Sequence, residues 1–520
     1  MSGEQSFNYD FVVVGSGFGG SVSALRLAER GYSVAVLEMG KRWNKEDFPH
    51  SNWNLWKHFW QPALGMYGIL QMTMTRDAFF VHGAGVGGGS LVYANTLLVP
   101  SSEAFSDPRW VGLDWQEALK PHYATAMRML GATESQVVTD ADRMLAEVAS
   151  DLGHGDSFRR HTVGVYFGEP GKTAPDPYFD GRGPERTGCT LCGGCMIGCR
   201  VGAKNTLDRN YLYLAEKLGL EVATETEVTA VRPAEGGYRV EARGGRVVTA
   251  KNVVLAGGVL GTLELLLRMK ADPQGLPRLS DRLGQFVRTN SESLIEVVSE
   301  RRDHDLSKGI AIGSILETDE HSHLEPTRYG AGSGFFRLLA APHVAGASFW
   351  IRMANLVGTV ARHPLRLLRA VLVPDFAKYS VILLYMRALE GSLRMKIGRG
   401  ITTGFAAGLT TELGEGPAPT ASIPEATELA RRVAEKIQGL PVSLMTETAL
   451  GVPTTAHILG GCCMGATADD GVIDSHHRVF GYDGLFVIDG SAVSANPGVN
   501  PSLTITALAE RAMSRIPPAS

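Results

Sequence analysis

The residues of clearest chemical interest are four cysteines that lie close together in the chain. Cys189, Cys192, Cys195 and Cys199 have the spacing C-x2-C-x2-C-x3-C, which is typical of a bacterial ferredoxin. Loops this short allow several thiolates to bind one iron–sulfur cluster. Arg200 follows where ferredoxins place proline, and the chain has no second run of this kind. Three interpretations stay open: an iron–sulfur cluster, a four-thiolate zinc site, or reduced thiols without a metal.

A glycine-rich turn near the start of the chain has the pattern of a dinucleotide site. Residues 9–14 predict a buried parallel strand, residues 21–30 a helix, and residues 33–37 a second strand. The turn between the first strand and the helix reads Gly15-Ser16-Gly17-Phe18-Gly19-Gly20. Because this is the strand–turn–helix–strand setting that the dinucleotide fingerprint requires, a nucleotide site is favoured over an ordinary turn.

Each part of this turn has a physical reason. Gly15 permits the tight turn, Gly17 lets the backbone approach a pyrophosphate, and Gly20 lets helix and strand pack closely. The helix N-terminus offers amide donors to the phosphates. Glu38 ends the second strand, where a carboxylate can accept hydrogen bonds from ribose hydroxyls. The pattern alone does not distinguish NAD from FAD.

Three later segments extend this interpretation. Residues 83–90 form a second glycine loop, which suits backbone contact with a large planar ligand or, alternatively, a crossing between packed layers. Residues 252–258 form a strand that ends in Ala-Gly-Gly and leads into a helix. Residues 484–491 form another strand and turn before a helix from 502 to 515. Strands that alternate with helices predict an α/β fold with a doubly wound parallel sheet.

Composition excludes several classes of protein. The chain has 520 residues, of which 44% are hydrophobic and 20% charged, so it is neither disordered nor fibrous. Its 62 glycines exceed the usual share of about 7%. A net charge of −4 gives no basic field for nucleic acid. The N-terminus has no signal-peptide pattern, so we expect a cytoplasmic location.

The ordered motifs resemble the glucose–methanol–choline (GMC) oxidoreductase family, in the branch of the mycobacterial-type cholesterol oxidases. The resemblance covers nearly the whole chain and implies FAD as cofactor. The segments that carry it are Gly15–Gly20 with Glu38, Gly85–Ser90, Gly202–Thr206, Ala256–Gly258, His457–Gly461, and Asp489–Gly490 through Gly498–Pro501.

The resemblance implies a two-part fold. An FAD-binding, Rossmann-like domain with ββα insertions is expected at 1–97, 216–292 and 466–520. An α+β substrate domain, built on an antiparallel sheet, is expected at 98–215 and 293–465.

It also implies roles for individual residues. His457 and Asn500 match the pair that holds the alcohol oxygen and assists its deprotonation while hydride leaves for the flavin. Glu325 matches a glutamate that moves a steroid double bond, although alone it reads equally well as a surface carboxylate. FAD contacts are expected at Gly15, Gly17, Phe18, Gly19, Gly20, Glu38, Gly85, Gly89, Tyr93, Val228, Asp489, Gly490, Asn500 and Ser502.

One departure concerns how FAD is attached. Relatives that bind FAD covalently have a histidine where this chain has Tyr93. The expected FAD is therefore non-covalent.

A basic, apolar segment at 326–374 has no acidic residue while containing six arginines. Its longest uncharged stretch is too short to span a bilayer. Two helical pieces around Pro342 and Pro364 are expected. Arginine with apolar residues suits a helix lying on an anionic membrane; a packed lid or an oligomer contact is the alternative.

The expected activity is oxidation of a bulky apolar alcohol, with sterols first, by hydride transfer to FAD. Oxygen or another carrier, including an electron-acceptor protein, could take the electrons. One alternative is a long-chain or terpenoid alcohol dehydrogenase that passes electrons through an iron–sulfur cluster. An alternative from another class is a redox-inactive flavin- or lipid-binding protein.

Overall fold

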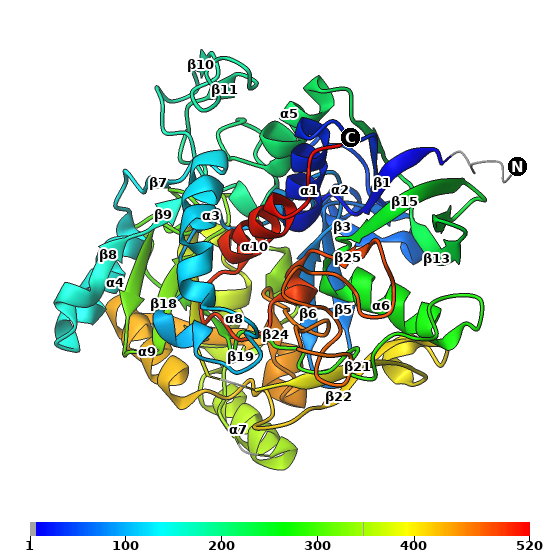
Figure 1. The fold of residues 1–520 in the computed structure, drawn as a ribbon. Coiled ribbons are helices and arrows are strands. Elements are labelled where there is room, and N and C mark those ends of the chain that lie inside the picture. Colours follow the sequence, from blue (N-terminus) through cyan, green and yellow to red (C-terminus); the bar gives the residue numbers. More distant parts are fainter. Residues whose placement is uncertain (1–6, 347, 390, 520) are drawn as a thin grey trace, which may run out of the picture.

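The computed structural model describes residues 7–346, 348–389 and 391–519, and it is organised around two large sheets (Figure 1). The first sheet is mainly parallel, as the sequence predicts. Its strand order is β12-β2-β1-β15-β14-β13, and β25 pairs with the second half of β15. The strands are β1 (Tyr9–Val14), β2 (Val34–Leu37), β12 (Glu221–Ala223), β13 (Val228–Ala234), β14 (Gly237–Ala242), β15 (Val247–Leu255) and β25 (Leu485–Val487).

Helices pack around this sheet. The helix predicted at 21–30 begins at Phe18, since the glycine turn leads directly into its first turn. Helix α10 packs between α1 and α3 in Figure 1. The helices of this part are α1 (Phe18–Glu29), α3 (Trp115–Met129), α5 (Tyr211–Lys217), α6 (Gly258–Ala271) and α10 (Ser502–Ser514).

The second large sheet is antiparallel, which confirms the predicted fold class. Its order is β19-β23-β16-β20-β18-β17-β8. Helices α4 (Asp140–Asp151) and α9 (Pro424–Lys436) cover one face with a buried apolar cluster. The strands are β8 (Phe158–Arg160), β16 (Ser293–Ser299), β17 (Ser314–Glu317), β18 (Ser322–Thr327), β19 (Ala340–Pro342), β20 (Ser380–Arg387) and β23 (Gly439–Leu444). The strands of the two sheets come from different parts of the chain, while the exact domain boundaries stay a prediction.

Smaller elements complete the fold. One small sheet contains β3 (Phe59–Gln61), β4 (Met66–Tyr67), β5 (Leu70–Met74), β6 (Phe79–Gly83) and β24 (Thr454–Thr455). Two-stranded pairs are formed by β7 (Thr133–Glu134) with β9 (Thr162–Val163), β10 (Thr173–Ala174) with β11 (Arg186–Thr187), and β21 (Leu393–Gly398) with β22 (Gly408–Leu413). Further helices are α2 (Leu55–His58), α7 (Phe349–Arg362) and α8 (Pro364–Val371).

One local expectation needs correction, and one strand was not expected. Strand β6 leads into the second glycine loop, which the sequence did not reveal. Pro342 lies in β19 rather than in a helix, because the helical pieces begin only at Phe349 and Pro364. Pro364 stands in the first turn of α8, where its missing N–H costs nothing.

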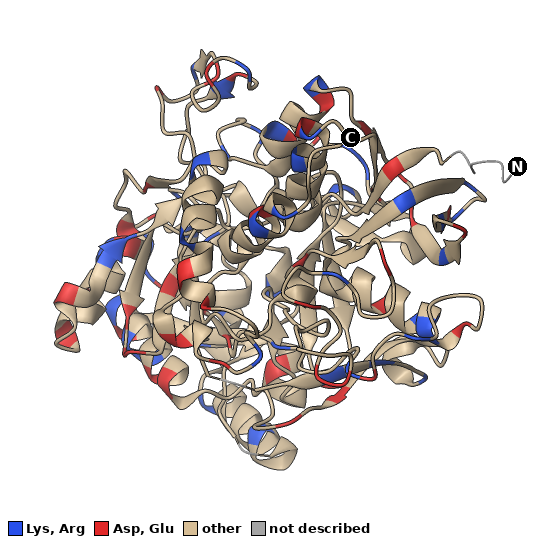
Figure 2. Cartoon of the chain, viewed as in Figure 1, with Lys and Arg blue, Asp and Glu red and all other residues tan. Residues whose placement is uncertain are grey.

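Charged residues of both signs are interspersed over the molecule (Figure 2), in keeping with the net charge of −4. Within the described ranges, no helix is long and apolar enough to cross a membrane.

Candidate active site and cofactor cradle

The predicted phosphate loop forms a cradle that fits a pyrophosphate. Gly17 caps α1, and a Cβ added there would meet nothing within 4 Å. Its neighbours are crowded: a Cβ on Gly19 would lie 1.7 Å from the carbonyl oxygen of Ile488, and one on Gly20 would lie 2.1 Å from that of Gly15. Open space ahead of a helix N-terminus, with glycines behind it, is what a bound phosphate group requires.

Glu38 braces this loop from the end of β2. Its carboxylate accepts hydrogen bonds from the Ser16 amide at 3.0 Å, the Ser16 hydroxyl at 2.6 Å and the Gly40 amide at 2.8 Å. Burial raises the pKa of Glu38. The Thr226 amide donates to the Glu38 carbonyl oxygen at 2.8 Å, so the segment leading to Val228 lies beside the expected ribose position.

Asp489 and Gly490 lie at the other side of the cradle, where β25 ends against α1. The buried Asp489 carboxylate accepts from the Ser491 amide at 2.8 Å and from the Thr262 hydroxyl at 2.5 Å. The carboxylate therefore shapes the turn, and a cofactor contact here falls to the backbone. Ser502 opens α10, and its hydroxyl donates to the carbonyl oxygen of Thr96.

The second glycine loop meets the first. A Cβ on Gly88 would lie 2.7 Å from the Cα of Gly17. The Tyr93 ring stands 5.7 Å from the Phe18 ring, and its hydroxyl donates to the carbonyl oxygen of Asn205 at 2.6 Å. Gly85 and Gly89 lie in the same loop, so the predicted residues of the two glycine loops are brought together around one cradle that fits FAD.

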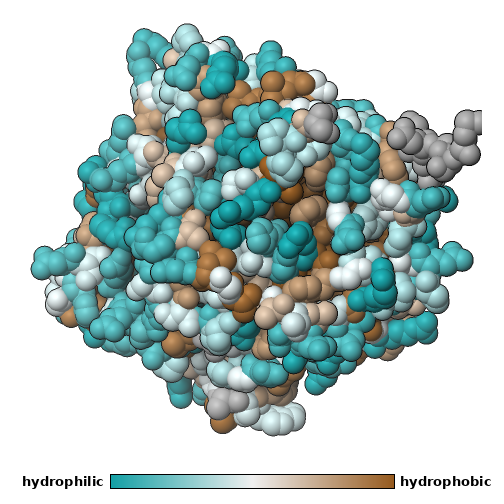
Figure 3. All heavy atoms as spheres, viewed as in Figure 1, coloured by the Kyte–Doolittle hydropathy of each residue, from teal (hydrophilic) through white to brown (hydrophobic). Residues whose placement is uncertain are grey.

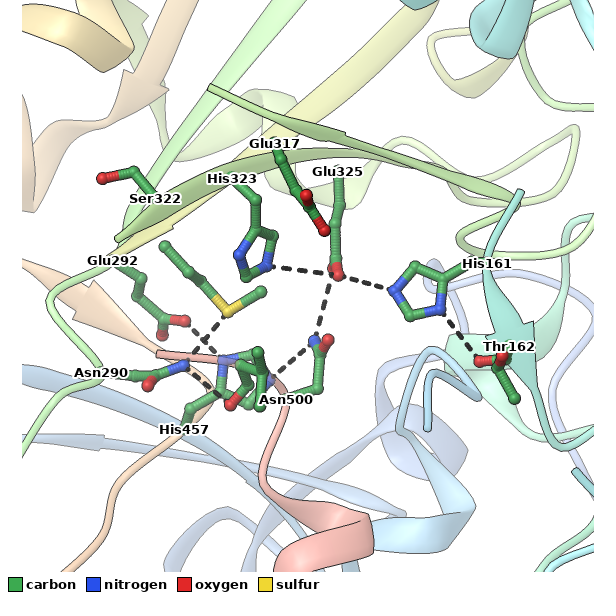
Figure 4. Close-up of polar contacts among 12 residues, drawn as sticks. His161, Thr162, Asn290, Glu292, Glu317, Ser322, His323, Glu325, His457 and Asn500 are labelled. Atoms are coloured by element: carbon green, nitrogen blue, oxygen red, sulfur yellow. Dashed lines mark hydrogen bonds and ion pairs between the residues drawn. The ribbon is translucent and has the colours of Figure 1, made fainter. Parts of the chain in front are cut away.

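His457 is held by a residue that sequence reasoning missed. Glu292, which is fully buried, lies 2.5 Å from His457 Nδ1 through one carboxylate oxygen and accepts from the Ala456 amide through the other (Figure 4). An Nδ1–H donated to Glu292 leaves the Nε2 lone pair free to accept a proton. Burial opposes a charge on the ring, but the Glu292 carboxylate outweighs it and raises the pKa of His457.

Asn500 joins His457 to Glu325. Its Nδ2 lies 3.5 Å from His457 Nε2 and 3.4 Å from Glu325 Oε2 (Figure 4). The Asn500 Oδ1 is buried without a partner, which leaves an acceptor facing the site. The structure thus brings the three predicted catalytic residues together.

Glu325 is fully buried on β18, so its alternative interpretation as a surface carboxylate is wrong. His161 Nε2 lies 2.9 Å and His323 Nε2 3.5 Å from its Oε1. Burial would raise the pKa of Glu325, but these two imidazoles hold it below its ordinary value. His161 and His323 were not predicted. His323 stands two residues before Glu325 on a strand, a spacing that puts both side chains on one face and could have been noticed.

A cavity lies on the same face of the sheet. Thr327, which is two residues after Glu325 on β18, lines this cavity. Ile382, which pairs with Thr327 on β20, and Glu296, which pairs with Ile382 on β16, also line it. The cavity's atom-free space of about 300 Å³ includes open solvent, and the enclosed part holds only about one water molecule. Tyr329, Phe336 and Phe376 line it beside the polar residues Asn52, Arg328 and Ser380. Burial raises the pKa of Glu296 to about 7, which keeps much of this carboxyl neutral near pH 7. The lining thus begins two residues along β18 from Glu325.

The four cysteines Cys189, Cys192, Cys195 and Cys199 lie apart from His457, Asn500 and Glu325. All of them are free, and all border one second cavity.

Comparison with known families gives three matches. Residues 414–509 match GMC oxidoreductase, residues 13–43 match the NAD(P)-binding Rossmann-like domain, and residues 83–290 match flavin containing amine oxidoreductase.

Curated relatives align over almost the whole chain. A cholesterol oxidase of Acinetobacter baumannii is 43% identical, with 98% of this chain and 95% of the relative covered. A cholesterol oxidase of Mycobacterium tuberculosis is 44% identical, with 98% and 91% covered. Among solved structures, pyridoxine 4-oxidase from Mesorbium loti matches with a TM-score of 0.62 at 16% identity, over 98% of this chain and 99% of that one, which shows the shared fold.

Proposed function

The chain belongs to the GMC oxidoreductase family and is an FAD-dependent alcohol oxidoreductase, and from this premise we propose that it oxidises a sterol or a similarly bulky apolar secondary alcohol. The observation that carries the proposal is the contact of Asn500 with both His457 and Glu325, which sets a buried carboxylate beside the groups expected to act on the alcohol. The names of the 43–44% identical relatives support the same substrate class.

The reaction divides between the cofactor and the chain. When bound, FAD supplies the acceptor for the hydride that leaves the alcohol carbon. His457 Nε2 accepts the hydroxyl proton, because Glu292 holds the ring from its other nitrogen. Asn500 fixes the alcohol oxygen beside that nitrogen, and Glu325 orients the Asn500 amide.

An anaerobic substrate screen tests the proposal. The holoenzyme is mixed with sterols, long-chain primary alcohols and terpenols, and bleaching of the flavin absorbance is followed by stopped flow. We expect sterols to bleach the flavin fastest. Faster bleaching by a primary long-chain alcohol or a terpenol would overturn the sterol assignment, and no bleaching by any of them would favour a redox-inactive protein. The position of the double bond in a steroid product reports separately whether Glu325 moves it.

The Glu292→Gln variant is expected to shift the pH profile of flavin reduction. The reaction needs neutral His457, whose pKa is raised by Glu292, so the wild-type rate rises with pH through that raised pKa. Removing the negative charge lowers the pKa of His457, and the acidic limb should move to lower pH by about 1 unit or more. A lower maximal rate with an unmoved limb would show that Glu292 does not act through the charge of His457.

We also propose that helices α7 and α8 rest on an anionic membrane surface, where an apolar alcohol dissolves. On α7, Trp350 is 78% exposed and Val357 is 67% exposed, seven residues apart on one helix face. Apolar side chains reach the surface at the lower tip of the molecule, where α7 lies (Figure 3). Arg362 and Arg369 are exposed beside these residues, while Arg366 pairs with Glu300. Exposed apolar residues flanked by arginines fit an anionic lipid surface.

Vesicle sedimentation tests this contact. Wild-type protein should bind vesicles that contain phosphatidylserine, and bind less in high salt because salt screens the arginines. The double variant Trp350→Glu, Val357→Glu should bind these vesicles with an affinity at least about tenfold lower than that of the wild type. The matched control is Leu218→Glu, at the end of α5 on the opposite side of the molecule in Figure 1, where Leu218 is 56% exposed. Equal binding by both variants, or self-association through this face in sedimentation velocity, would overturn the membrane assignment.

A further inference from the structure

The four cysteines of the ferredoxin-like run line one cavity. Cys189, Cys192, Cys195 and Cys199 border about 310 Å³ of atom-free space, part of which opens to solvent. Apart from Lys204, the rest of the lining is apolar or glycine. In two-cluster ferredoxins the fourth cysteine of such a run binds another cluster, but here Cys199 faces the same cavity as the other three. The set of four is therefore complete in itself.

A single metal ion does not fit this arrangement. Tetrahedral zinc needs four thiolates that point at one ion with Zn–S distances of about 2.3 Å. In the described part of the chain, no group of three or more His, Cys, Asp or Glu side chains is placed to hold one metal ion. In a four-iron, four-sulfide cube each thiolate binds a different corner, so the cysteine sulfurs stand further apart. The ferredoxin spacing favours the cluster over zinc, and free thiols stay the alternative.

The loop backbone is specifically shaped around the cavity. Gly193 has φ +69°, and a Cβ there would lie 2.2 Å from the Ser307 carbonyl oxygen. Leu191 has φ +57°, a left-handed conformation that costs free energy for a residue with a Cβ. The amides of Leu191 and Lys204 donate to the sulfurs of Cys189 and Cys199, each at 3.4 Å. Amide N–H···S bonds stabilise cluster ligands and set their potential.

Lys204 is the one charged residue among the described residues that line the cavity. It is 1% exposed, and its ammonium donates to the carbonyl oxygens of Leu91 at 2.8 Å and Cys195 at 2.6 Å. Lys204 is thereby anchored to the backbone of both the cysteine loop and the end of the second glycine loop, so it joins the cavity to the flavin cradle.

The cavity also lies next to the flavin cradle. The Lys204 ammonium is 5.2 Å from the centre of the Tyr93 ring, and that ring is 5.7 Å from Phe18 of the phosphate loop. Arg200, the departure from the ferredoxin pattern, is exposed and contacts His50, so it does not enter the cavity.

We infer that Cys189, Cys192, Cys195 and Cys199 bind a [4Fe–4S] cluster that carries electrons away from the flavin site, an inference that rests on the proposed alcohol oxidation. Oxidation of the alcohol to a carbonyl releases two electrons and two protons. The protons leave to solvent, and the electrons pass one at a time through the cluster to a one-electron acceptor protein. The enzyme is then a dehydrogenase, and oxygen is a poor acceptor.

Metal analysis of protein purified without oxygen is the direct test. The expected content is about four iron and four acid-labile sulfide per chain, with a reduced-state electron paramagnetic resonance signal. Cys192→Ala, at the one exposed cysteine of the four, should lose at least half of the iron. The matched control is Cys463→Ser, a cysteine outside the cavity, which should keep all of it. Iron and sulfide absent from wild-type protein, even after reconstitution with iron and sulfide, would overturn the inference, as would stoichiometric zinc or equal iron in both variants.

Kinetics separate this inference from the proposed function. Anaerobic flavin reduction by the alcohol should be the same in Cys192→Ala and wild type, because that half-reaction does not use the cluster. Turnover with a one-electron dye should fall at least tenfold in Cys192→Ala. If flavin reduction fails in wild type while the cluster is present, the substrate assignment is wrong and the cluster assignment stands. If flavin is reduced and wild-type protein makes peroxide rapidly without iron, the enzyme is an oxidase.

Discussion

His457→Ala is expected to slow anaerobic flavin reduction by at least ~100-fold while FAD stays bound. In the proposed reaction Nε2 of His457 takes the hydroxyl proton, and a positioned acid–base group contributes about 10² to 10⁴ in rate. Asn500→Ala should lose a comparable amount, because its amide places the alcohol oxygen beside Nε2. Stopped-flow reduction with a saturating alcohol measures both effects, and the flavin absorbance of the purified variants reports cofactor content.

His343→Ala is the matched control for this experiment. His343 is also a largely enclosed histidine with two side-chain partners, Ser443 at 2.9 Å and Thr427 at 3.0 Å, but it lies outside the catalytic group. It should reduce its flavin at the wild-type rate. A His457→Ala variant that keeps the wild-type rate would remove His457 from the reaction and leave Asn500 and Glu325 as the candidates.

The phosphate loop could be predicted because its chemistry is local. Strand β1, the turn and α1 are consecutive in the chain, and each glycine has a steric reason that needs only its immediate neighbours. The cysteine run is similar, since its short spacing keeps the four thiols close enough to border one cavity. Near-continuous apolar strands with helices between them predict the parallel sheet for the same reason.

The supports of the catalytic residues could not be predicted, because the tertiary fold alone brings them together. Glu292 is 165 residues from His457, and His161 is 164 residues from Glu325. Glu292 directly precedes β16 and looks like an ordinary surface carboxylate in the sequence. His161 reaches Glu325 only because β8, β17 and β18 pair in register, which no local pattern fixes.

The same limit applies to the electrostatics of the site. A glutamate followed by proline gives no sign of two neighbouring imidazoles, yet these hold the pKa of the Glu325 carboxyl below its ordinary value. The sequence resemblance could name Glu325 but could not decide whether it is buried. The structure shows that Glu325 is buried between His161 and His323 and accepts from the Asn500 amide. Glu325 can therefore position Asn500 as well as act as a candidate base.

Gly17→Val is expected to remove FAD without unfolding the protein. Gly17 has φ −70°, which any residue adopts, and a Cβ there would meet no protein atom within 4 Å. The added side chain would instead occupy the space where the backbone approaches the pyrophosphate. We expect FAD affinity to fall at least ~100-fold, equal to about 2.8 kcal/mol, while the apoprotein melts at the wild-type temperature. Titration of apoprotein with FAD by fluorescence measures the affinity.

A substitution at Gly17 tests FAD binding alone, because the other glycines of the loop pack against the backbone and their substitution would also destabilise the protein. A Cβ on Gly19 would collide with the Ile488 carbonyl, so Gly19→Val should lose FAD by unfolding the loop and lower the melting temperature. Gly400→Val is the matched control, since Gly400 is extended at φ −179° and equally open, but lies after β21, away from the cradle. The Gly400→Val variant should bind FAD with wild-type affinity and melt at the wild-type temperature. If Gly17→Val binds FAD as tightly as wild type, the pyrophosphate does not bind at the N-terminus of α1, and the role assigned to the first glycine loop must be given up.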